Sequence, residues 1–178
     1  MNSTTIDVNK KKKGFTLVEM LATLIIVVLF TMMLTTFIDL TVEHFNNSVK
    51  NADAQTLAST LTNAVEDELR YATDITVDEE GNYKYFSTSL GLGKNCVIKN
   101  VVKNINGENR NILVVDSDRM SEYPLINHGS YVYDLNAYIT ATYTNDIFNV
   151  SISIKDRNEK EICKSDFAVV PLNPNTMN

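Results

Sequence analysis

An uninterrupted apolar run near the N-terminus constrains this chain more than any other feature. From Met20 to Ile38 the sequence holds nineteen residues without a single charge. As a helix rising 1.5 Å per residue, this run reaches roughly 28 Å, which nearly spans the hydrocarbon core of a bilayer. Four lysines, Lys10, Lys11, Lys12 and Lys13, stand just ahead of it. By the positive-inside rule they predict a cytoplasmic N-terminus and an extracytoplasmic remainder.

The helical pattern continues well beyond the apolar run. No glycine and no proline occurs from Phe15 to Glu80, a stretch of 66 residues, and these two residues are the main helix breakers. After Asp39 the apolar residues recur at spacings of three to five and stay on one helical face: Val42, Phe45, Val49, Ala52, Leu57, Leu61, Val65, Leu69 and Ala72. The simplest prediction is one helix over 15–72, apolar all round in 15–38 and amphipathic thereafter. An ordinary signal peptide fits less well, because the run exceeds a usual h-region and no A-x-A site follows it.

From residue 73 to 178 the pattern changes to short runs rich in Val, Ile, Tyr and Thr. Asn106-Gly107 separates two such runs and predicts a tight turn. The clearest hairpin joins 137–143 to 147–154, of which the second alternates apolar and polar residues. A last strand is expected over 161–170, with Pro171 and Pro174 ending regular structure after it. The fold class is therefore α+β, with a long helix and a largely antiparallel β-sheet head packed on its amphipathic half.

The sequence contains no catalytic constellation, so we expect no enzyme, no cofactor, no metal and no evident small-molecule substrate. His44 and His128 are tied to no nucleophile or carboxylate pair. The oxygen-rich triplet 116–118 lacks the later Gly and Glu of a calcium-binding loop. The net charge of −6 argues against broad, nonspecific binding of nucleic acid, although a local basic patch stays open.

Two cysteines, Cys96 and Cys163, lie in the polar C-terminal part of the chain. One interpretation is a pair of unrelated, small buried side chains. The other is a disulfide, which could persist because the topology predicted above places this part outside the cytoplasm. Zinc is not favoured, since neither cysteine belongs to a CxxC pattern and no histidine cluster accompanies them.

Glu19 is an unusual residue, because it lies at the edge of the apolar segment with no basic side chain on the helix to pair with it. An acid near the end of a membrane span is costly unless it is solvated or paired. Its place in the first helical turn suits the helix macrodipole. The alternative is a cationic partner. Cleavage of the chain after Gly14 would create one, the new α-amino group of Phe15, which could pair with Glu19 of a neighbouring subunit.

The segment Lys10–Leu21, with Gly14-Phe15-Thr16-Leu17-Val18-Glu19 at its centre, resembles the processing site of type IV pilins and of the pseudopilins of type II secretion and competence systems. The resemblance extends over residues 10–38. It implies that a prepilin peptidase removes a leader, 1–14, by cutting between Gly14 and Phe15, and that the new amine of Phe15 is methylated. It also implies that Glu19 serves filament assembly, and that the partners are other pilins, the peptidase, the membrane and an inner-membrane assembly platform.

Two features favour a minor subunit over the bulk subunit of a pilus. Many major pilins carry a proline in the apolar segment, whereas this chain has none before Pro124. The stretch from Glu68 to Ile75 also looks like the helix-to-head junction of the J/W class of minor pilins and pseudopilins. The expected role is structural, in a filament for adhesion, motility, secretion or DNA uptake. The alternatives are a single-span sensor or receptor with an extracytoplasmic ligand-binding β domain, and, less favoured, a hydrolase on a membrane stalk.

Overall fold

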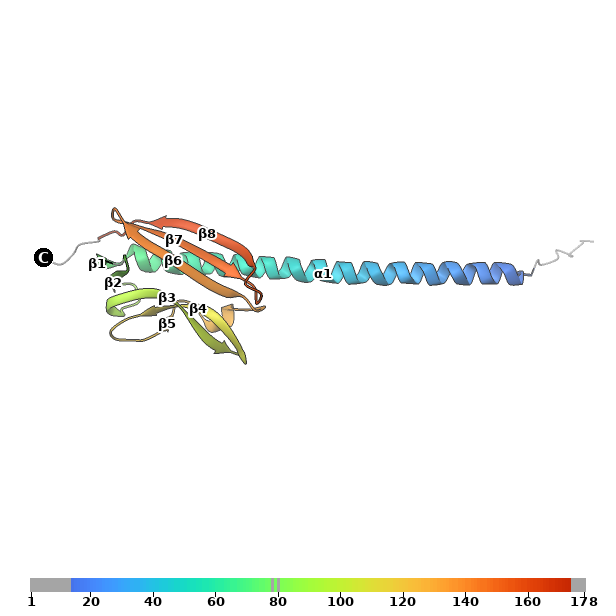
Figure 1. The fold of residues 1–178 in the computed structure, drawn as a ribbon, viewed down its shortest axis with the longest axis horizontal. Helices are drawn as coiled ribbons and strands as arrows, with labels where there is room; N and C mark the ends of the chain where they lie inside the picture. Colours follow the sequence, from blue (N-terminus) through green and yellow to red (C-terminus); the bar gives the residue numbers. More distant parts are fainter. Residues whose placement is uncertain (1–13, 78, 80, 174–178) are drawn as a thin grey trace, which may run out of the picture. The chain divides into compact units, whose positions relative to one another are not determined.

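The computed structural model describes residues 14–77, 79 and 81–173 of the 178-residue chain. The chain forms two units, Met1–Asn46 and Asn47–Asn178. One helix, α1 (Leu17–Arg70), runs through the boundary, and the strands all belong to the second unit (Figure 1). The predicted α+β class is confirmed. The helix begins two residues later and ends two residues earlier than the range 15–72 expected from the sequence.

The C-terminal half of α1 supplies one wall of the core in the second unit. The helical face predicted from the apolar spacing is buried from Leu57 onward, whereas its earlier members Val42, Phe45 and Ala52 are exposed. The buried residues of α1 are Ala54, Leu57, Ala58, Leu61, Val65, Glu68 and Leu69. Burying a leucine side chain contributes about 1.5–3 kcal/mol, so this stripe is a principal source of stability. Polar contacts fix its position further: the Thr62 hydroxyl donates to Ser165 at 3.1 Å, and Lys50 pairs with Asp156 at 3.7 Å.

The first sheet contains five antiparallel strands in the order β1-β2-β3-β4-β5. Their bounds are β1 (Thr73–Val77), β2 (Tyr83–Ser87), β3 (Gly93–Ile105), β4 (Glu108–Asp116) and β5 (Tyr123–Pro124). The turn predicted at Asn106-Gly107 joins β3 to β4, with Ile105 opposite Glu108. Both turn residues have positive φ, 54° and 88°, which is the conformation that makes Asn-Gly the preferred sequence there. A short 3-10 helix, η1 (His128–Ser130), follows β5.

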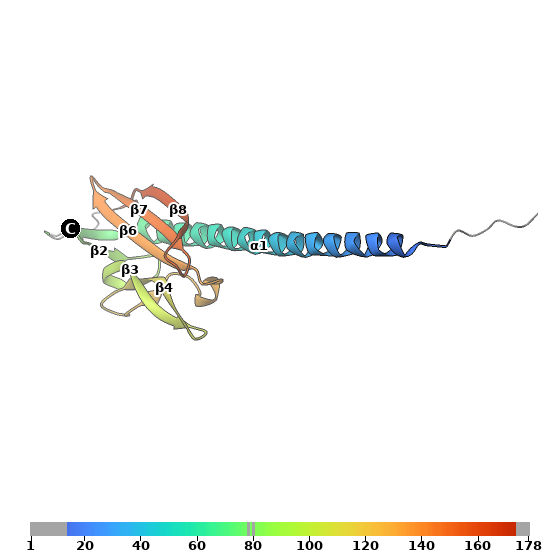
Figure 2. The same cartoon turned by 45° about the vertical axis from the view of Figure 1, so that its right-hand side comes forward.

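The second sheet contains three antiparallel strands in the order β6-β7-β8. These are β6 (Asn136–Thr144), β7 (Ile147–Lys155) and β8 (Glu161–Val169), and they lie along the C-terminal turns of α1 in both views (Figure 2). The β6–β7 hairpin confirms the one predicted from the sequence. Strand β8 ends one residue before the predicted limit, and Pro171 lies beyond it. Pro174, the other predicted terminator, is outside the described residues.

Asparagine side chains connect the two sheets. The amide of Asn100 on β3 accepts a hydrogen bond from the Ile139 backbone N–H at 2.9 Å and donates to the Ile139 carbonyl at 3.3 Å. The Asn100 amide therefore satisfies the backbone N–H and C=O of Ile139 in β6, as the backbone of a neighbouring strand would. A second amide, that of Asn136, accepts from the backbone N–H of Asn111 at 2.7 Å. The expected sheet is thus divided into two, and side-chain amides bridge the place where strand pairing stops.

The structure does not form the disulfide considered between Cys96 and Cys163; both are free thiols. Cys163 donates to the carbonyl of Ala54 at 3.4 Å, whereas Cys96 pairs in register with Tyr85, whose hydroxyl lies near Glu68. Ala54 and Glu68 are fourteen residues apart on α1, a rise of roughly 21 Å. A disulfide needs Cα atoms within about 7 Å. The helix therefore holds the two thiols at separate levels of the core.

We expect Asn100→Ala to lower the free energy of unfolding by about 1–3 kcal/mol, because a partly buried N–H and C=O of Ile139 lose their partner. Thermal unfolding of the full-length protein in detergent, followed by near-UV circular dichroism of the tyrosines, measures the effect. Asn149→Ala is the matched control. Its amide makes one long, exposed contact of 3.4 Å, so its effect should stay within about 0.5 kcal/mol. Equal effects of the two substitutions would contradict the bridging role of Asn100.

Thiol chemistry tests the separation of the cysteines. Burial raises the pKa of both the Cys96 and the Cys163 thiol, so each should react slowly with iodoacetamide in the folded protein. After denaturation without a reductant, mass spectrometry should find both thiols alkylated. Alkylation that requires a reductant would show that the two sulfurs are bonded.

Candidate functional site

The residues that the sequence singled out for processing lie just before α1. Gly14 and Phe15 precede the first helical residue, Leu17, and both are exposed. A Cβ added to Gly14 would meet no atom within 4 Å, and Phe15 is 76% exposed. Within the described residues the peptide bond between them is therefore open to an enzyme. The lysines at 10–13 lie outside the described residues.

Thr16 and Glu19 form a capping box at the start of α1. The backbone N–H of Thr16 donates to Glu19 Oε2 at 2.9 Å, and the Thr16 hydroxyl donates to the same oxygen at 3.0 Å. In return, the Glu19 N–H donates to Thr16 Oγ1 at 3.3 Å. The first N–H groups of a helix have no partner inside it, and this reciprocal pair satisfies two of them. The Glu19 carboxylate thus already accepts two hydrogen bonds from Thr16 of its own chain.

The cap has a signature in the sequence, Thr16-x-x-Glu19, that the expectations above do not include. Those expectations explain an acid at position 19 by the macrodipole or by an amine of another subunit. The structure supplies a third reason, since both bonds from Thr16 end on Oε2. The other carboxylate oxygen, Oε1, is then available to a donor from outside the helix.

The apolar segment of α1 presents its side chains outward. Its large apolar residues are 45–81% exposed from Leu17 to Phe45. Among the described residues, α1 alone is long and apolar enough to cross a membrane, and its most apolar window has a mean hydropathy of 2.6. A surface of this kind requires lipid or a bundle of like helices around it.

Threonine is the polar residue that recurs within this segment, and its hydroxyls are satisfied locally. The hydroxyls of Thr31, Thr35, Thr36 and Thr41 donate to the carbonyl four residues earlier, at 2.7–3.1 Å, and that of Thr23 donates to the carbonyl three residues earlier, at 2.8 Å. No threonine hydroxyl in this stretch is left to seek water, so the segment can be transferred to an apolar medium without an unpaired donor.

The acidic triplet considered for calcium is occupied by protein partners. Asp116 pairs with Lys99 at 2.7 Å and accepts the Glu122 N–H at 3.2 Å, while Asp118 accepts from the Asn95 amide at 2.6 Å. These contacts hold the loop between β4 and β5. In the part of the chain that the structure describes, no three His, Cys, Asp or Glu side chains are grouped to hold a metal ion.

The junction expected between Glu68 and Ile75 contains a buried acid. Glu68 is 1% exposed and accepts a hydrogen bond from the hydroxyl of Ser89. The Tyr85 hydroxyl lies near Glu68 without a hydrogen bond, and burial, followed by the negative charge of Glu68, raises the pKa of Tyr85 well above its usual value. Leu69 is buried, whereas Tyr71 is 48% exposed.

Comparison with protein families identifies residues 9–35 as the prokaryotic N-terminal methylation motif. No curated protein and no solved structure matches the chain. This motif marks the type IV pilin and pseudopilin family. Proteins of that family are structural rather than enzymes, and they are processed by a prepilin peptidase and assemble with other pilins.

The cap makes a local prediction. Thr16→Val, which keeps the shape of the side chain and removes its hydroxyl, should destabilise the first turn of α1 by about 0.5–2 kcal/mol. Hydrogen exchange of the amides of residues 17–20, measured on the full-length protein in nanodiscs, should accelerate correspondingly. Thr16→Ser keeps the hydroxyl and should exchange like the wild type. Unchanged exchange in Thr16→Val would contradict the cap.

Proposed function

We propose that this protein is a minor pilin or pseudopilin, cut after Gly14 and assembled through its N-terminal helix into a type IV pilus-like filament. The observation that carries the proposal is the register of three features: a contact-free Gly14–Phe15 bond, an acid at position 19 and an exposed apolar helix. The filament would serve adhesion, motility, secretion or DNA uptake. Besides other pilins and the peptidase, its partners would include an inner-membrane assembly platform.

Cleavage would supply the positively charged partner that Glu19 lacks. The cut creates an α-amino group at Phe15, and methylation keeps it basic. In a bundle of apolar helices a carboxylate needs both hydrogen bonds and an opposite charge. Thr16 of the same chain already donates to Oε2, so the amine of an adjacent subunit would approach Oε1. The ion pair would thus form, and stabilise the filament, only when the incoming helix has the correct axial position.

The topology follows from the charges around the apolar segment. The lysines at 10–13 would hold the N-terminus in the cytoplasm, and the unit with the two sheets would lie outside the membrane and then at the cell surface. The absence of proline before Pro124 favours a minor subunit, because many bulk pilins carry a proline in the apolar segment. The Glu68–Ile75 junction supports the J/W class in particular.

The N-terminus of the mature protein tests this proposal. Mass spectrometry of the protein from its own host should find residue 15 first, as N-methylphenylalanine. Gly14→Leu should leave the leader attached, because a side chain at this position obstructs the cut. A mature chain that retains Met1 would contradict the proposal and favour the rival, a single-span receptor.

Assembly can be tested separately. Glu19→Ala should be cut normally, yet should enter sheared filaments at least about tenfold less, since leaving one charge of a buried pair without its partner costs several kcal/mol. Glu43→Ala is the matched control, because Glu43 is an exposed acid farther along the same helix. Quantitative immunoblots of sheared and membrane fractions measure both. Equal incorporation of the two variants would remove Glu19 from assembly.

A further inference from the structure

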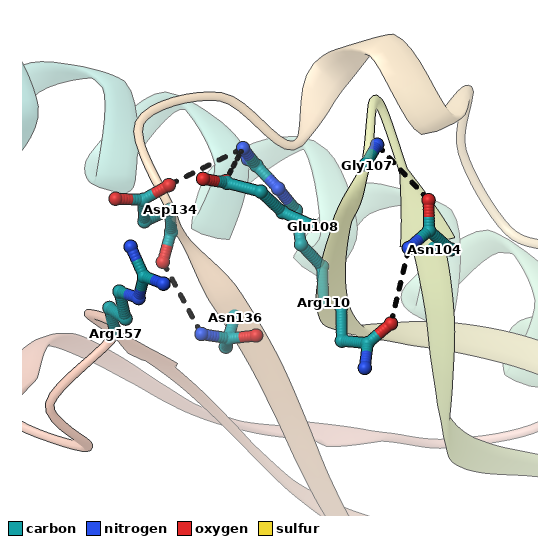
Figure 3. A pocket seen from close by; sticks show the side chains of 8 residues that line it. Asn104, Gly107, Glu108, Arg110, Asp134, Asn136 and Arg157 are labelled. Atoms are coloured by element: carbon teal, nitrogen blue, oxygen red, sulfur yellow. Dashed lines mark hydrogen bonds and ion pairs between the residues drawn. The ribbon is translucent and has the colours of Figure 1, made fainter.

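A polar cavity of about 320 Å³ lies in the second unit, apart from the processing and assembly residues. Three segments border it: the turn and first residues of the β3–β4 hairpin, the residues that lead into β6, and the β7–β8 turn (Figure 3). Apart from Gly107, all its lining residues carry a charged or amide side chain. A cavity lined mainly by polar groups differs from the usual small-molecule site, which is mostly apolar with a few polar groups.

Arg110 forms the fixed floor of the cavity. Its side chain is 11% exposed and donates to the Tyr131 carbonyl at 2.6 Å. The same guanidinium pairs with Glu108 at 2.9 Å and with Asp134 at 3.5 Å. Both carboxylates are thereby held at the cavity, while their remaining lone pairs can accept further hydrogen bonds. Arg110 therefore orients the acceptors of the site.

The backbone beside the cavity is strained. Tyr133 and Asp134 follow one another with φ of 49° and 58°, the left-handed region that residues other than glycine seldom adopt. For a bulky residue such as Tyr133 this conformation is an outlier, and such outliers cluster at ligand sites. Here the strained turn places the Asp134 carboxylate on Arg110. The strained backbone at Tyr133 and Asp134 thus serves to position the Asp134 carboxylate at the cavity.

The outer wall offers donors. Arg157, on the β7–β8 turn, forms no ion pair or hydrogen bond with any other residue that the structure describes, and its guanidinium lies beside Asp134 and Asn136 (Figure 3). On the hairpin, Asn109 accepts from the Asn104 amide through its Oδ1 at 3.3 Å, which leaves its own NH₂ group free to donate. The cavity therefore combines carboxylate acceptors that Arg110 holds in place with the free donors of Arg157 and Asn109 next to them.

We propose that this cavity binds a neutral saccharide. The charges of its lining cancel, because two arginines face two carboxylates, so neither an anion nor a cation is favoured overall. A ligand without polar groups would displace water from the free donors and acceptors of the lining without replacing its hydrogen bonds, which is costly. A sugar hydroxyl both donates and accepts, so it satisfies carboxylates and amides alike. The volume lies at the lower end of the range for small-ligand sites and suits one or two sugar rings. The proposal does not depend on how the N-terminus is processed.

Glycan binding by the full-length protein tests the proposal. The protein should be placed in lipid nanodiscs, because alkyl glycoside detergents would bring sugar head groups to the site. It is screened against an array of neutral and acidic saccharides, and hits are measured by titration calorimetry. Arg157→Ala and Asn109→Ala should each weaken binding of a neutral glycan about fivefold to twentyfold, the loss expected for one or two hydrogen bonds.

Both substituted residues are exposed, so the fold should survive. Matched controls are Arg119→Ala and Asn158→Ala, exposed residues of the same types outside the lining, which should bind like the wild type. No binding to any saccharide, or binding that all four variants retain, would overturn the proposal. Binding confined to acidic saccharides and lost in Arg157→Ala alone would also overturn it, because the ligand would then be an anion.

Discussion

The buried stripe on the C-terminal half of α1 is the contact on which the rest of the second unit depends. Leu57, Leu61, Val65 and Leu69 lie between 0% and 3% exposed, in one core cluster with strands of both sheets. A three-stranded antiparallel sheet such as β6-β7-β8 needs an apolar cover on one face to be stable. The helix supplies that cover, and the sheets in turn supply the burial that the helix needs. Neither part has an adequate core without the other.

The two halves of α1 have different surroundings, and their patterns of apolar residues differ accordingly. Up to residue 45 its apolar side chains are exposed, and from residue 54 onward an apolar stripe is covered by strands. What the two halves share is the absence of glycine and proline, which lets one hydrogen-bonded rod pass from one environment to the other. The threonines of the first half return their hydroxyls to the helix itself. These hydroxyls therefore keep a hydrogen-bond partner even where water would be absent.

Much of this architecture could be predicted from the sequence, because it follows from local rules. The helix follows from spacing and missing helix breakers, and two hairpins follow from Asn106-Gly107 and from alternation in 147–154. The methylation motif, found independently over residues 9–35, was equally visible. The capping box is equally local, because Thr16 lies three residues before Glu19, but an argument from charge alone does not reveal it.

What could not be predicted depends on contacts between distant segments. The division into two sheets rests on Asn100 meeting Ile139, thirty-nine residues away, and nothing in either neighbourhood marks the pair. The sequence also left open whether Cys96 and Cys163 are bonded. Their separation depends on the positions of Ala54 and Glu68 along α1, and neither cysteine belongs to that helix. The polar cavity is a stronger case, since its residues come from three segments and only tertiary structure brings Arg110 to Asp134.

The polar cavity lies apart from the buried stripe of α1. None of its lining residues belongs to the helix, so a substitution in the cavity leaves the helix contacts of the core in place. The polar cavity is built from a hairpin tip, a strained turn and a loop, which are the parts of a fold that tolerate change best. Asn136 is the exception, because it lines the cavity and also accepts the Asn111 N–H that joins the two sheets. The proposed site could therefore change its ligand through exposed members such as Asn109 and Arg157 without disturbing the helix.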